Sequence, residues 1–412
     1  MTQLLPHLLI AGAGIGGLGA ALALARAGVR VTVLEQTDAF GEVGAGVQVS
    51  PNAFAVLSGW GLREALLQVA NFPLAMQARD AATHRLLGQI DLGDTARSNY
   101  GFDYACIHRA DLHQVLLDAV RQQPLVTLQL NAKIVAVSEL AQAVQVSTEQ
   151  GASHGADALI GCDGLWSQVR QHVLGAQPPL ATGHVAWRAL LPMRMVPSQL
   201  QSQRVIAWLA PHMHAVAYPV RRSQFLNVVV VTEDDNPAST PNPQSWSRDA
   251  TGLSPLESIK NSNQPVNILS DVLSNLLQKV TEPGGGGWTR WTLFDRDPVR
   301  SSQELAHPAH PRLALLGDAA HPMRPYLAQG AAMALEDAQA LAMAISQQAN
   351  DLPAALQLYA RQRWQRNARV QARSRRSGAI FHLEGPLRWG RDTAMGLFGH
   401  RLMDLPWLYK QP

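Results

Sequence analysis

The stretch Leu8-Leu9-Ile10-Ala11-Gly12-Ala13-Gly14-Ile15-Gly16-Gly17 decides the fold of the chain. Its four apolar residues predict a short buried strand, and the Ala- and Leu-rich segment after the glycines predicts a helix that ends near Ala27. Val29–Leu34 predicts a second strand, which closes a strand–helix–strand unit of about 30 residues. Such a unit crosses over right-handedly and builds a parallel sheet.

The glycines follow the pattern Gly12-x-Gly14-x-x-Gly17, which is typical of a turn that binds a dinucleotide. Gly12 permits the tight turn, Gly14 lets a pyrophosphate approach the backbone, and Gly17 lets the helix pack closely on the strand. Free amides at the helix start favour the phosphate charge. Glu35 ends the second strand 18 residues after Gly17, where a carboxylate can accept from both ribose hydroxyls. The alternative is a glycine-rich turn with a purely structural role.

A second apolar strand, Leu313–Leu316, ends on Gly317-Asp318 and leads through prolines to a helix that starts near Gln329-Gly330-Ala331. An acid at the carboxyl end of a buried parallel strand lies where α/β sheets bind ligands. The amides of the helix start favour an anionic flavin edge or phosphate. His321 and Pro322 are expected to shape the turn. Two walls so far apart in sequence favour FAD, held in an extended pose, over NAD alone.

A third motif follows the buried strand Ala156–Cys162, which ends on Asp163-Gly164. Asp163 can contribute to the cofactor site, or it can cap the helix that follows without a functional role. The residues alone leave these alternatives open.

Bulk composition narrows the class of protein. The 412 residues allow two or three domains, and 34 Lys plus Arg against 31 Asp plus Glu give a net charge of +3, too small to indicate a nucleic-acid partner. We expect the basic cluster Arg361–Arg376 to form a solvated helix face. Cys106 and Cys162 are expected in the core, and no ligand spacing indicates a metal. No apolar run reaches about 18 residues, so we predict a cytoplasmic protein without integral membrane association.

The middle of the chain is β-rich, with short runs such as Val205–Leu209 and Phe225–Val231, followed by an expected loop region at 233–265. We therefore predict a mixed α/β fold, in which a Rossmann-like FAD-binding domain with a parallel sheet is interrupted by a mostly antiparallel β-sheet substrate domain. The expected FAD-binding domain comprises 1–72, 98–180 and 290–375, the substrate domain 73–97 and 181–289, and the C-terminal helices 376–412.

These motifs, in this order, resemble the FAD-dependent aromatic-ring hydroxylases, a family of single-component flavoprotein monooxygenases, and in particular its salicylate hydroxylase-like and 3-hydroxybenzoate 6-hydroxylase-like members. Gly44–Asn52, His108–Leu112 and the ending Trp407-Leu408-Tyr409 add to the resemblance. It implies tightly bound, non-covalent FAD, NADH or NADPH as a transient co-substrate, and a possible homodimer. The implied reaction inserts one oxygen atom from O2 into a small aromatic or N-heteroaromatic acid through a flavin C4a-hydroperoxide.

Residue by residue, the resemblance assigns Glu35 to the adenosine ribose, Asp318 to the ribityl chain, and Asp163 to FAD and the passing nicotinamide. It places Arg109 on FAD and Gly330 and Ala331 near the isoalloxazine. The implied cofactor-binding set is Gly12, Gly14, Ile15, Gly17, Glu35, Val47, Arg109, Leu130, Asp163, Gly317, Asp318, Gly330 and Ala331.

A base near the substrate hydroxyl would speed hydroxylation. His212, His214 and Tyr218 fall on one face of a predicted strand. We predict Tyr218 first and His214 second as catalytic residues, with partly exposed strand residues as the alternative for the histidines.

The predicted substrate pocket comprises Gln48, Arg188, Pro325 and Tyr326. The similar 6-hydroxynicotinate-type enzymes have a histidine at the position of Gln48, and that histidine is their expected base. The residue at the position of Tyr326 varies with the substrate. The identity of the base in this chain therefore stays open. Arg188 and Arg324 can each clamp a carboxylate or lie on the surface.

Two other functions remain open at this stage. One is oxidation of a larger lipid-like phenol or polyprenyl substrate, with Phe398, Leu402, Leu405 and Trp407 either touching a membrane or packed in a terminal helix. The other, from a different class, is an NAD-binding dehydrogenase or nucleotide-sensing module without oxygen chemistry; a non-catalytic flavin scaffold is a weaker variant.

Overall fold

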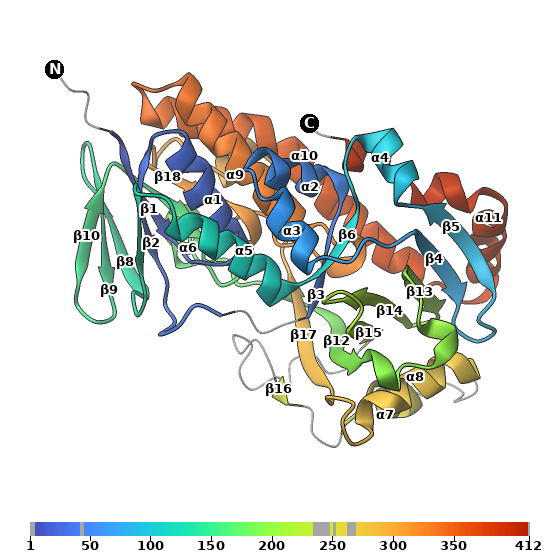
Figure 1. Cartoon of the computed structure of the whole chain (residues 1–412). Helices are drawn as coiled ribbons and strands as arrows, with labels where there is room; N and C mark the ends of the chain where they lie inside the picture. Colours follow the sequence, from blue (N-terminus) through green and yellow to red (C-terminus); the bar gives the residue numbers. More distant parts are fainter. Residues whose placement is uncertain (1–4, 42–44, 234–247, 250–252, 262–268, 411–412) are drawn as a thin grey trace.

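The computed structural model describes residues 5–41, 45–233, 248–249, 253–261 and 269–410 (Figure 1). Most of the expected loop region at 233–265 and Gly44 of the segment Gly44–Asn52 fall outside the described residues. Within that loop region the structure describes β16 (Arg248–Asp249) and α7 (Pro255–Asn261).

The predicted parallel sheet is present and has five strands in the order β18-β11-β1-β2-β7. All four neighbouring pairs are parallel, and α1 (Ile15–Arg26) connects β1 to β2 as expected. The strands are β1 (His7–Ala11), β2 (Arg30–Leu34), β7 (Val126–Gln129), β11 (Ala158–Gly161) and β18 (Leu313–Leu315).

Burial explains why these short runs form strands. Leu8, Leu9 and Ile10 of β1 are at most 1% exposed, because helices cover the sheet. The helix α1 contacts both α5 (Arg109–Arg121) and α9 (Gly330–Gln347), and α6 (Gln168–Leu174) packs on β11 and β18. Cys106 is fully buried, as predicted, whereas Cys162 is half-buried and packs against the core.

The second sheet has eight strands in the order β16-β17-β12-β15-β14-β13-β4-β5. Its pairs are antiparallel except β13 with β4, so the expectation of a mostly antiparallel sheet is confirmed. The bounds are β4 (Ala75–Asp80), β5 (Leu86–Asp91), β12 (Leu180–Pro192), β13 (Arg204–Ala210), β14 (Met213–Val220), β15 (Phe225–Glu233) and β17 (Thr289–Asp295). Most of β17 thus extends past residue 289, where the expected substrate domain ends.

One face of this sheet is covered by α7 and α8 (Asp271–Thr281), which lie on its outer side in Figure 1. The helix α8 buries Leu273, Leu276, Leu277 and Val280, so its predicted amphipathic character is confirmed. The other face turns toward the parallel sheet and the C-terminal helices, and it carries the pocket residues described below.

The remaining elements connect and flank the two sheets. They are α2 (Pro51–Gly59), α3 (Arg63–Val69), α4 (Asp94–Tyr100), the pair β3 (Gly46–Val49) and β6 (Ala105–His108), the sheet of β8 (Ile134–Glu139), β9 (Val144–Thr148) and β10 (Ser153–Ala156), and the helices α10 (Leu352–Phe381), α11 (Gly385–Met403) and α12 (Pro406–Tyr409). Short 3-10 helices include η7 (Pro325–Leu327).

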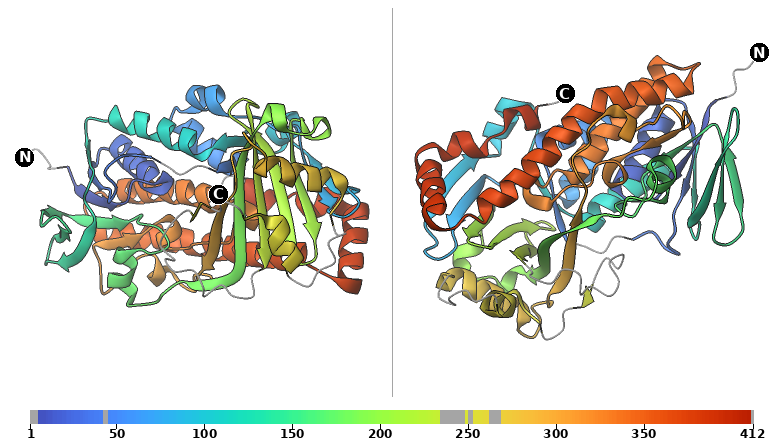
Figure 2. Two further views of the ribbon diagram at one scale, coloured as in Figure 1. Left: turned by 90° about the horizontal axis from the view of Figure 1, so that it is seen from below. Right: turned by 180° about the vertical axis from the view of Figure 1, so that it is seen from behind.

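The long helix α10 runs along the back of the molecule from the parallel sheet toward α11 (Figure 2). It contains the whole basic cluster Arg361–Arg376, and the prediction of a solvated face is wrong for three of its arginines. Arg363 is 3% exposed and ion-paired with Asp337, Arg366 pairs with Glu336, and Arg375 pairs with Asp295. These side chains point inward because α9 and β17 offer carboxylates that compensate their charge.

The helix α11 packs on β5 and leaves apolar side chains exposed on its other side. The backbones of Gly399 and Gly88 are in close contact, so α11 lies directly on β5, and the guanidinium of Arg369 lies 3.9 Å from the centre of the Trp407 ring. Phe398 and Leu402, in contrast, are 52% and 46% exposed. No helix in the described part of the chain combines the length and apolar character that a bilayer span requires.

Candidate functional site

The parallel sheet brings the sequence motifs into one row. In a parallel sheet all strands end at the same edge, so the carboxyl ends of β18, β11, β1, β2 and β7 are neighbours. The residues that follow these ends are, in this order, Asp318, Asp163, Gly12, Glu35 and Leu130. With a strand spacing of about 4.8 Å, three steps from β18 to β2 span roughly 15 Å, a distance that suits an extended dinucleotide.

The glycine turn shows the close contacts that its sequence predicts. Gly12 has φ +93°, a conformation that favours glycine, and a Cβ on Gly17 would lie 1.9 Å from the carbonyl oxygen of Gly12. Gly14 is the residue before α1, and Ile15 begins the helix. The turn therefore leaves backbone amides at the start of α1 with space for an anion.

Two carboxylates of the row already hold backbone groups. Glu35 accepts from the amide of Ala13 at 2.8 Å and from that of Thr37 at 3.0 Å, which fixes it beside the glycine turn. Asp163 accepts from the amides of Gln168 at 2.8 Å and Val169 at 3.2 Å, in the first turn of α6. The N-cap residue of α6 is Ser167, so Asp163 supports the start of the helix without being its N-cap, and a cofactor role for Asp163 stays a prediction.

Asp318 differs from these two because its carboxylate has an open side. Desolvation by the neighbouring protein raises the pKa of Asp318, although the charge of Arg109 opposes the shift. Asp318 nevertheless stays exposed to solvent. A Cβ on Gly330, the first residue of α9, would lie 3.8 Å from Asp318 Oδ1. Asp318, Gly317 and the start of α9 therefore lie together, and the cofactor role of these residues and of Ala331 stays a prediction.

The segments around Val47 and Arg109 lie together because β3 pairs with β6. Val47 is opposite Ile107, Gln48 is opposite Cys106, and the amide of Arg109 donates to the carbonyl of Ala45 at 2.9 Å. The glycine at position 46 then touches the eight-stranded sheet, where a Cβ would lie 2.5 Å from Cε2 of Tyr218. This contact joins the cofactor segments to the sheet that carries the catalytic candidates.

Tyr218 lies on the inner face of β14 and is 4% exposed. Its hydroxyl lies beside Gln48, whose Oε1 accepts from the Tyr104 hydroxyl at 2.5 Å. Burial raises the pKa of Tyr218 above its usual range, and neither Arg188 nor Gln48 reverses this. Tyr218 is therefore a neutral phenol at physiological pH, suited to donate a hydrogen bond and not to act as a base.

Arg188 lies on the same face of the sheet and stays charged. Burial, aided by repulsion from Arg109, lowers its pKa to about 10, and its guanidinium stacks on Trp291 at 4.0 Å from the ring centre. Its Nε is buried without a hydrogen-bond partner in the described part of the chain. No carboxylate pairs with it among the described residues, so a half-buried cation on this face has its charge uncompensated by an ion pair.

His214 and Tyr326 form the far end of this face. His214 is 3% exposed, so the alternative of a partly exposed residue is wrong for it, and its ring centre lies 5.2 Å from that of Tyr326. The Tyr326 hydroxyl bonds Nδ1 of His184 at 2.9 Å. Nδ1 of His214 bonds Nε2 of His382 at 2.9 Å. Between this end and Tyr218 lie half-buried apolar side chains, including Val216 and Val229.

The remaining candidates, Pro325 and Arg324, differ in their surroundings. Pro325 begins η7 and is exposed at the cleft, beside Tyr326. Arg324 donates from Nε to Asp295 at 2.7 Å, so it is not a free carboxylate clamp as one alternative supposed.

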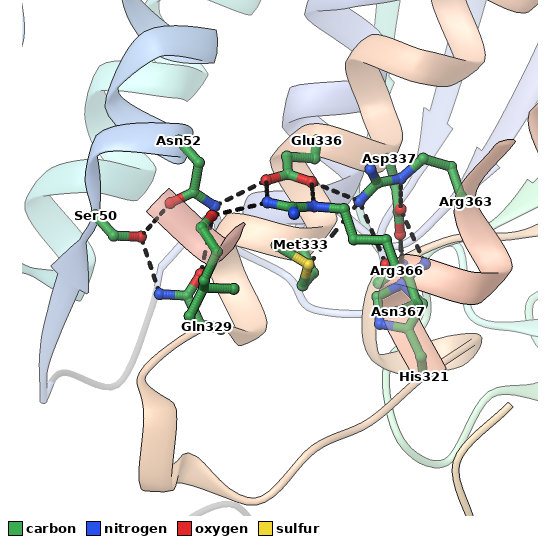
Figure 3. A network of polar contacts seen from close by, with 12 residues as sticks. Ser50, Asn52, His321, Gln329, Met333, Glu336, Asp337, Arg363, Arg366 and Asn367 are labelled. Carbon is green, nitrogen blue, oxygen red and sulfur yellow. Dashed lines mark hydrogen bonds and ion pairs between the residues drawn. The ribbon is translucent and has the colours of Figure 1, made fainter. Parts of the chain in front are cut away.

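A buried polar network supports the cofactor wall (Figure 3). Gln329, the residue before α9, donates to Ser50 at 2.9 Å, and Asn52 donates to Glu336 at 2.8 Å. Arg366 binds both oxygens of Glu336, at 2.7 and 2.8 Å. The network thereby ties the segment after β3 to α9 and α10.

The second half of this network surrounds Asp337, which is fully buried. Its carboxylate binds Nε of Arg363 at 2.7 Å, Nδ2 of Asn367 at 3.1 Å and Nε2 of His321. Burial alone would raise the pKa of Asp337, but the charges of His321 and Arg363 lower it. His321 thus shapes the turn after Asp318, as predicted.

Sequence reasoning did not single out Gln329, Asn227 and Tyr104 as site residues. The side chain of Asn227 accepts from the Gly46 amide at 2.7 Å and so holds β3 against the sheet. Its signal was a single polar residue inside the apolar run Phe225–Val231. Gln329 carried a similar signal, since it directly precedes the glycine of the helix start.

Buried histidines should make the protein acid-labile. Burial lowers the pKa of His184 to about 4 and that of His214 well below its usual value of 6.5. Their unfolded forms therefore bind protons first as the pH falls, so the contribution of these two histidines to stability is full above pH 6.5 and declines toward pH 4. We expect the melting temperature to drop over this range. A His214→Phe variant should show a shallower decline, and an equally steep one would contradict the assignment.

Two groups of described residues bring three potential metal ligands within reach of one ion: Glu139, His172 and His310, and His184, Glu233 and His382. In the second group both His382 nitrogens and His184 Nδ1 are already hydrogen-bonded to side chains. A metal would have to displace these bonds.

The glycine turn, the exposed Asp318 and the row of strand ends fit FAD. Comparison with known proteins agrees. The sequence matches the protein family described as FAD binding domain over residues 7–276 and 292–374. It is 36% identical over 391 residues to 3-hydroxybenzoate 6-hydroxylase 1 of Aquipseudomonas alcaligenes, covering 95% of this chain and 93% of the relative. It is 33% identical over 373 residues to 6-hydroxynicotinate 3-monooxygenase of Bordetella bronchiseptica, covering 89% and 90%.

Solved structures share the fold. A salicylate hydroxylase substrate complex superposes with a TM-score of 0.79 at 24% identity and covers 98% of this chain and 95% of that one. Klebsiella pneumoniae HpxO, solved with FAD and uric acid, has the same TM-score and identity and covers 97% and 95%. The matches confirm the predicted family and fold class, and the chain therefore belongs to the FAD-binding family of flavin-dependent aromatic-ring hydroxylases.

Proposed function

We propose that the chain is an NAD(P)H-dependent monooxygenase that hydroxylates a small aromatic acid. The observation that carries the proposal is Arg188, a half-buried arginine whose Nε is buried and which has no carboxylate partner in the described residues, on a mostly apolar sheet face. Burying a charge is costly unless it is paired, so this site is built for an anion. A ring with one carboxylate would bury its apolar faces on Val216 and Val229 and pair with Arg188.

A bound FAD would supply the redox chemistry, because NADH or NADPH can reduce it and the reduced flavin can activate O2. The chain's own residues orient the ring and handle its proton. Tyr218 donates to an oxygen of the substrate beside Gln48, while the neutral ring of His214 is available to accept a proton. This reverses the order of the two catalytic candidates: His214 is the better base and Tyr218 the better donor.

Turnover of a panel of aromatic acids tests the proposal. Purified, FAD-loaded protein should oxidise NADH or NADPH faster with one ring such as 3-hydroxybenzoate or 6-hydroxynicotinate, and the product should be heavier by one oxygen atom. A yellow protein that oxidises NAD(P)H with none of these acids, and yields no hydroxylated product, would exclude the proposal.

Replacing Arg188 by methionine should raise KM for the acid about 10- to 100-fold, because a charge-assisted hydrogen bond contributes roughly 1.5–3 kcal/mol. The same variant should show little change in KM for the matching phenol without a carboxylate. Steady-state kinetics with both compounds checks this. An equal loss for acid and phenol would mean that Arg188 supports the fold and does not bind the carboxylate.

A larger lipid-like phenol is the second candidate, supported by the exposed Phe398 and Leu402 of α11. Flotation with liposomes separates the two, since only this candidate expects the protein in the lipid fraction. The dehydrogenase alternative is set aside, because the relatives are hydroxylases and monooxygenases. A homodimer stays a prediction.

A further inference from the structure

A chain of hydrogen bonds leads from the pocket residue His214 to the protein surface. Nδ1 of His214 bonds Nε2 of His382 at 2.9 Å, and Nδ1 of His382 bonds Oε1 of Glu233 at 3.0 Å. The chain joins β14, the residue after α10, and the end of β15. Its inner end is buried, whereas the Glu233 side chain is 38% exposed.

The chemistry of these groups fixes the direction of each bond. An ionised carboxylate only accepts hydrogen bonds, so His382 must carry its proton on Nδ1. Nε2 of neutral His382 then accepts, and Nδ1 of His214 must donate. Neutral His214 is thereby left with an unprotonated Nε2, for which the described residues offer no hydrogen-bond partner.

Other groups hold the chain in place. His212 donates from Nδ1 to the second oxygen of Glu233 at 2.6 Å, and its Nε2 lies 3.0 Å from Glu384. The His184 ring stacks on His382 with ring centres 5.1 Å apart. Against this cluster also lie the Tyr326 hydroxyl on His184 and, farther off, the charge of Arg324. Glu233 keeps its negative charge because the bonds from His382 and His212 lower its pKa to about 2, despite partial burial.

We propose that Glu233, acting through His382, fixes the tautomer in which His214 can act as the general base for the substrate hydroxyl. The same hydrogen bonds conduct the proton that His214 accepts to the solvent. This rests on the proposed function, and it names positioning residues that touch no substrate atom. The tautomer of His214 is set by Glu233, which lies two hydrogen bonds away along the chain through His382.

The proton step balances without a redox partner. The O–H bond of the substrate breaks, its electron pair stays on oxygen, and a new N–H bond forms at Nε2 of His214. His214 releases the proton on Nδ1 to Nε2 of His382, and His382 releases its Nδ1 proton to Glu233. The exposed carboxylate passes that proton to water or buffer, so the site gains a phenolate and the solvent gains one proton.

The tautomer of His214 is measurable without turnover. Nitrogen NMR of histidine-labelled, FAD-loaded protein should show His214 protonated on Nδ1 in the parent chain, assigned by the signals lost in His214→Gln. In Glu233→Lys the ammonium can only donate to His382, which reverses both bonds and moves the His214 proton to Nε2. An unchanged tautomer in Glu233→Lys would overturn the proposal, whatever the substrate proves to be.

Kinetics supplies the second readout. General-base catalysis contributes about 10²- to 10⁴-fold, so kcat of Glu233→Gln should fall at least about 10-fold, with KM changed less than about threefold. Glu233→Asp, which keeps the carboxylate, should retain more activity, and added imidazole should restore part of the loss. Glu282→Gln, which removes a surface carboxylate bound to Lys279, is the matched control and should behave like the parent.

These readouts separate the two proposals. If the tautomer shifts as expected but no aromatic acid is hydroxylated, the proposed function fails and the positioning of His214 stands. If hydroxylation is normal and Glu233→Gln keeps its kcat, the proposed function stands and the role of Glu233 is excluded.

Discussion

Replacing Gly17 by alanine should give a purified protein without flavin. The added Cβ would lie 1.9 Å from the backbone oxygen of Gly12, far closer than non-bonded atoms approach. The oxygen is part of the backbone and the Cβ is fixed by the backbone of residue 17, so neither atom can turn away. Either α1 moves off β1 or the Gly12 turn opens, and both changes displace the amides that would face the pyrophosphate. Overpacking of this kind costs about 3 kcal/mol, which corresponds to roughly a 100-fold weaker affinity for FAD.

Titration of the apoprotein with FAD, followed by flavin fluorescence, measures this effect. Gly59→Ala is the matched control, because Gly59 ends α2 and a Cβ there meets nothing within 4 Å. This control should bind FAD like the parent. If Gly17→Ala also binds FAD with parental affinity, the turn does not hold the pyrophosphate.

Replacing Arg363 by alanine should cost about 3–5 kcal/mol of the free energy of unfolding. Arg363 is 3% exposed and pairs with Asp337 at 2.7 Å and Glu336 at 2.8 Å, so its loss leaves two buried carboxylates with less compensation. Typical total stabilities are about 5–15 kcal/mol, so the variant should be near the limit of folding.

Urea unfolding with and without FAD checks this expectation. Arg361→Ala, an exposed arginine of the same helix, should change the free energy of unfolding by less than about 0.5 kcal/mol. Equal effects of the two substitutions would mean that the network around Asp337 adds no stability. A loss of FAD affinity in Arg363→Ala beyond the loss of stability would show that the network also shapes the cofactor wall.

Most of the parallel sheet could be predicted because four of its strands are short apolar runs followed by glycine or an acid, whereas β7, with the mixed sequence Val126–Gln129, was not predicted. Strands of a parallel sheet are buried on both faces and therefore apolar throughout, so Leu8–Ala11 and Leu313–Leu316 were each predicted as a buried strand. The pairing of β3 with β6 could not be predicted in this way. Each strand has four residues, and its place depends on contacts with distant groups such as Asn227 and Tyr218.

Charged and polar residues were the least predictable part of the site. The spacing of Arg363 and Arg366 gives no sign of the carboxylates on α9 that draw them inward. The geometry also changed the expectation for Tyr218, since its burial is a property of the packed sheet and not of its neighbours in sequence. By contrast, strand alternation alone predicted that His214 lies on the same face as Tyr218, but it did not predict its partners His382 and Glu233.

The position of β18 has a consequence for how the protein is made. This strand completes the edge of the parallel sheet next to β11, yet the whole eight-stranded sheet except β4 and β5 lies between them in the chain. A ribosome therefore exposes an incomplete sheet, with β11 as an open edge, until three quarters of the protein has been synthesised. The flavin can find its full binding wall only late in synthesis, and nascent chains that stall before β18 carry a surface that invites misassembly.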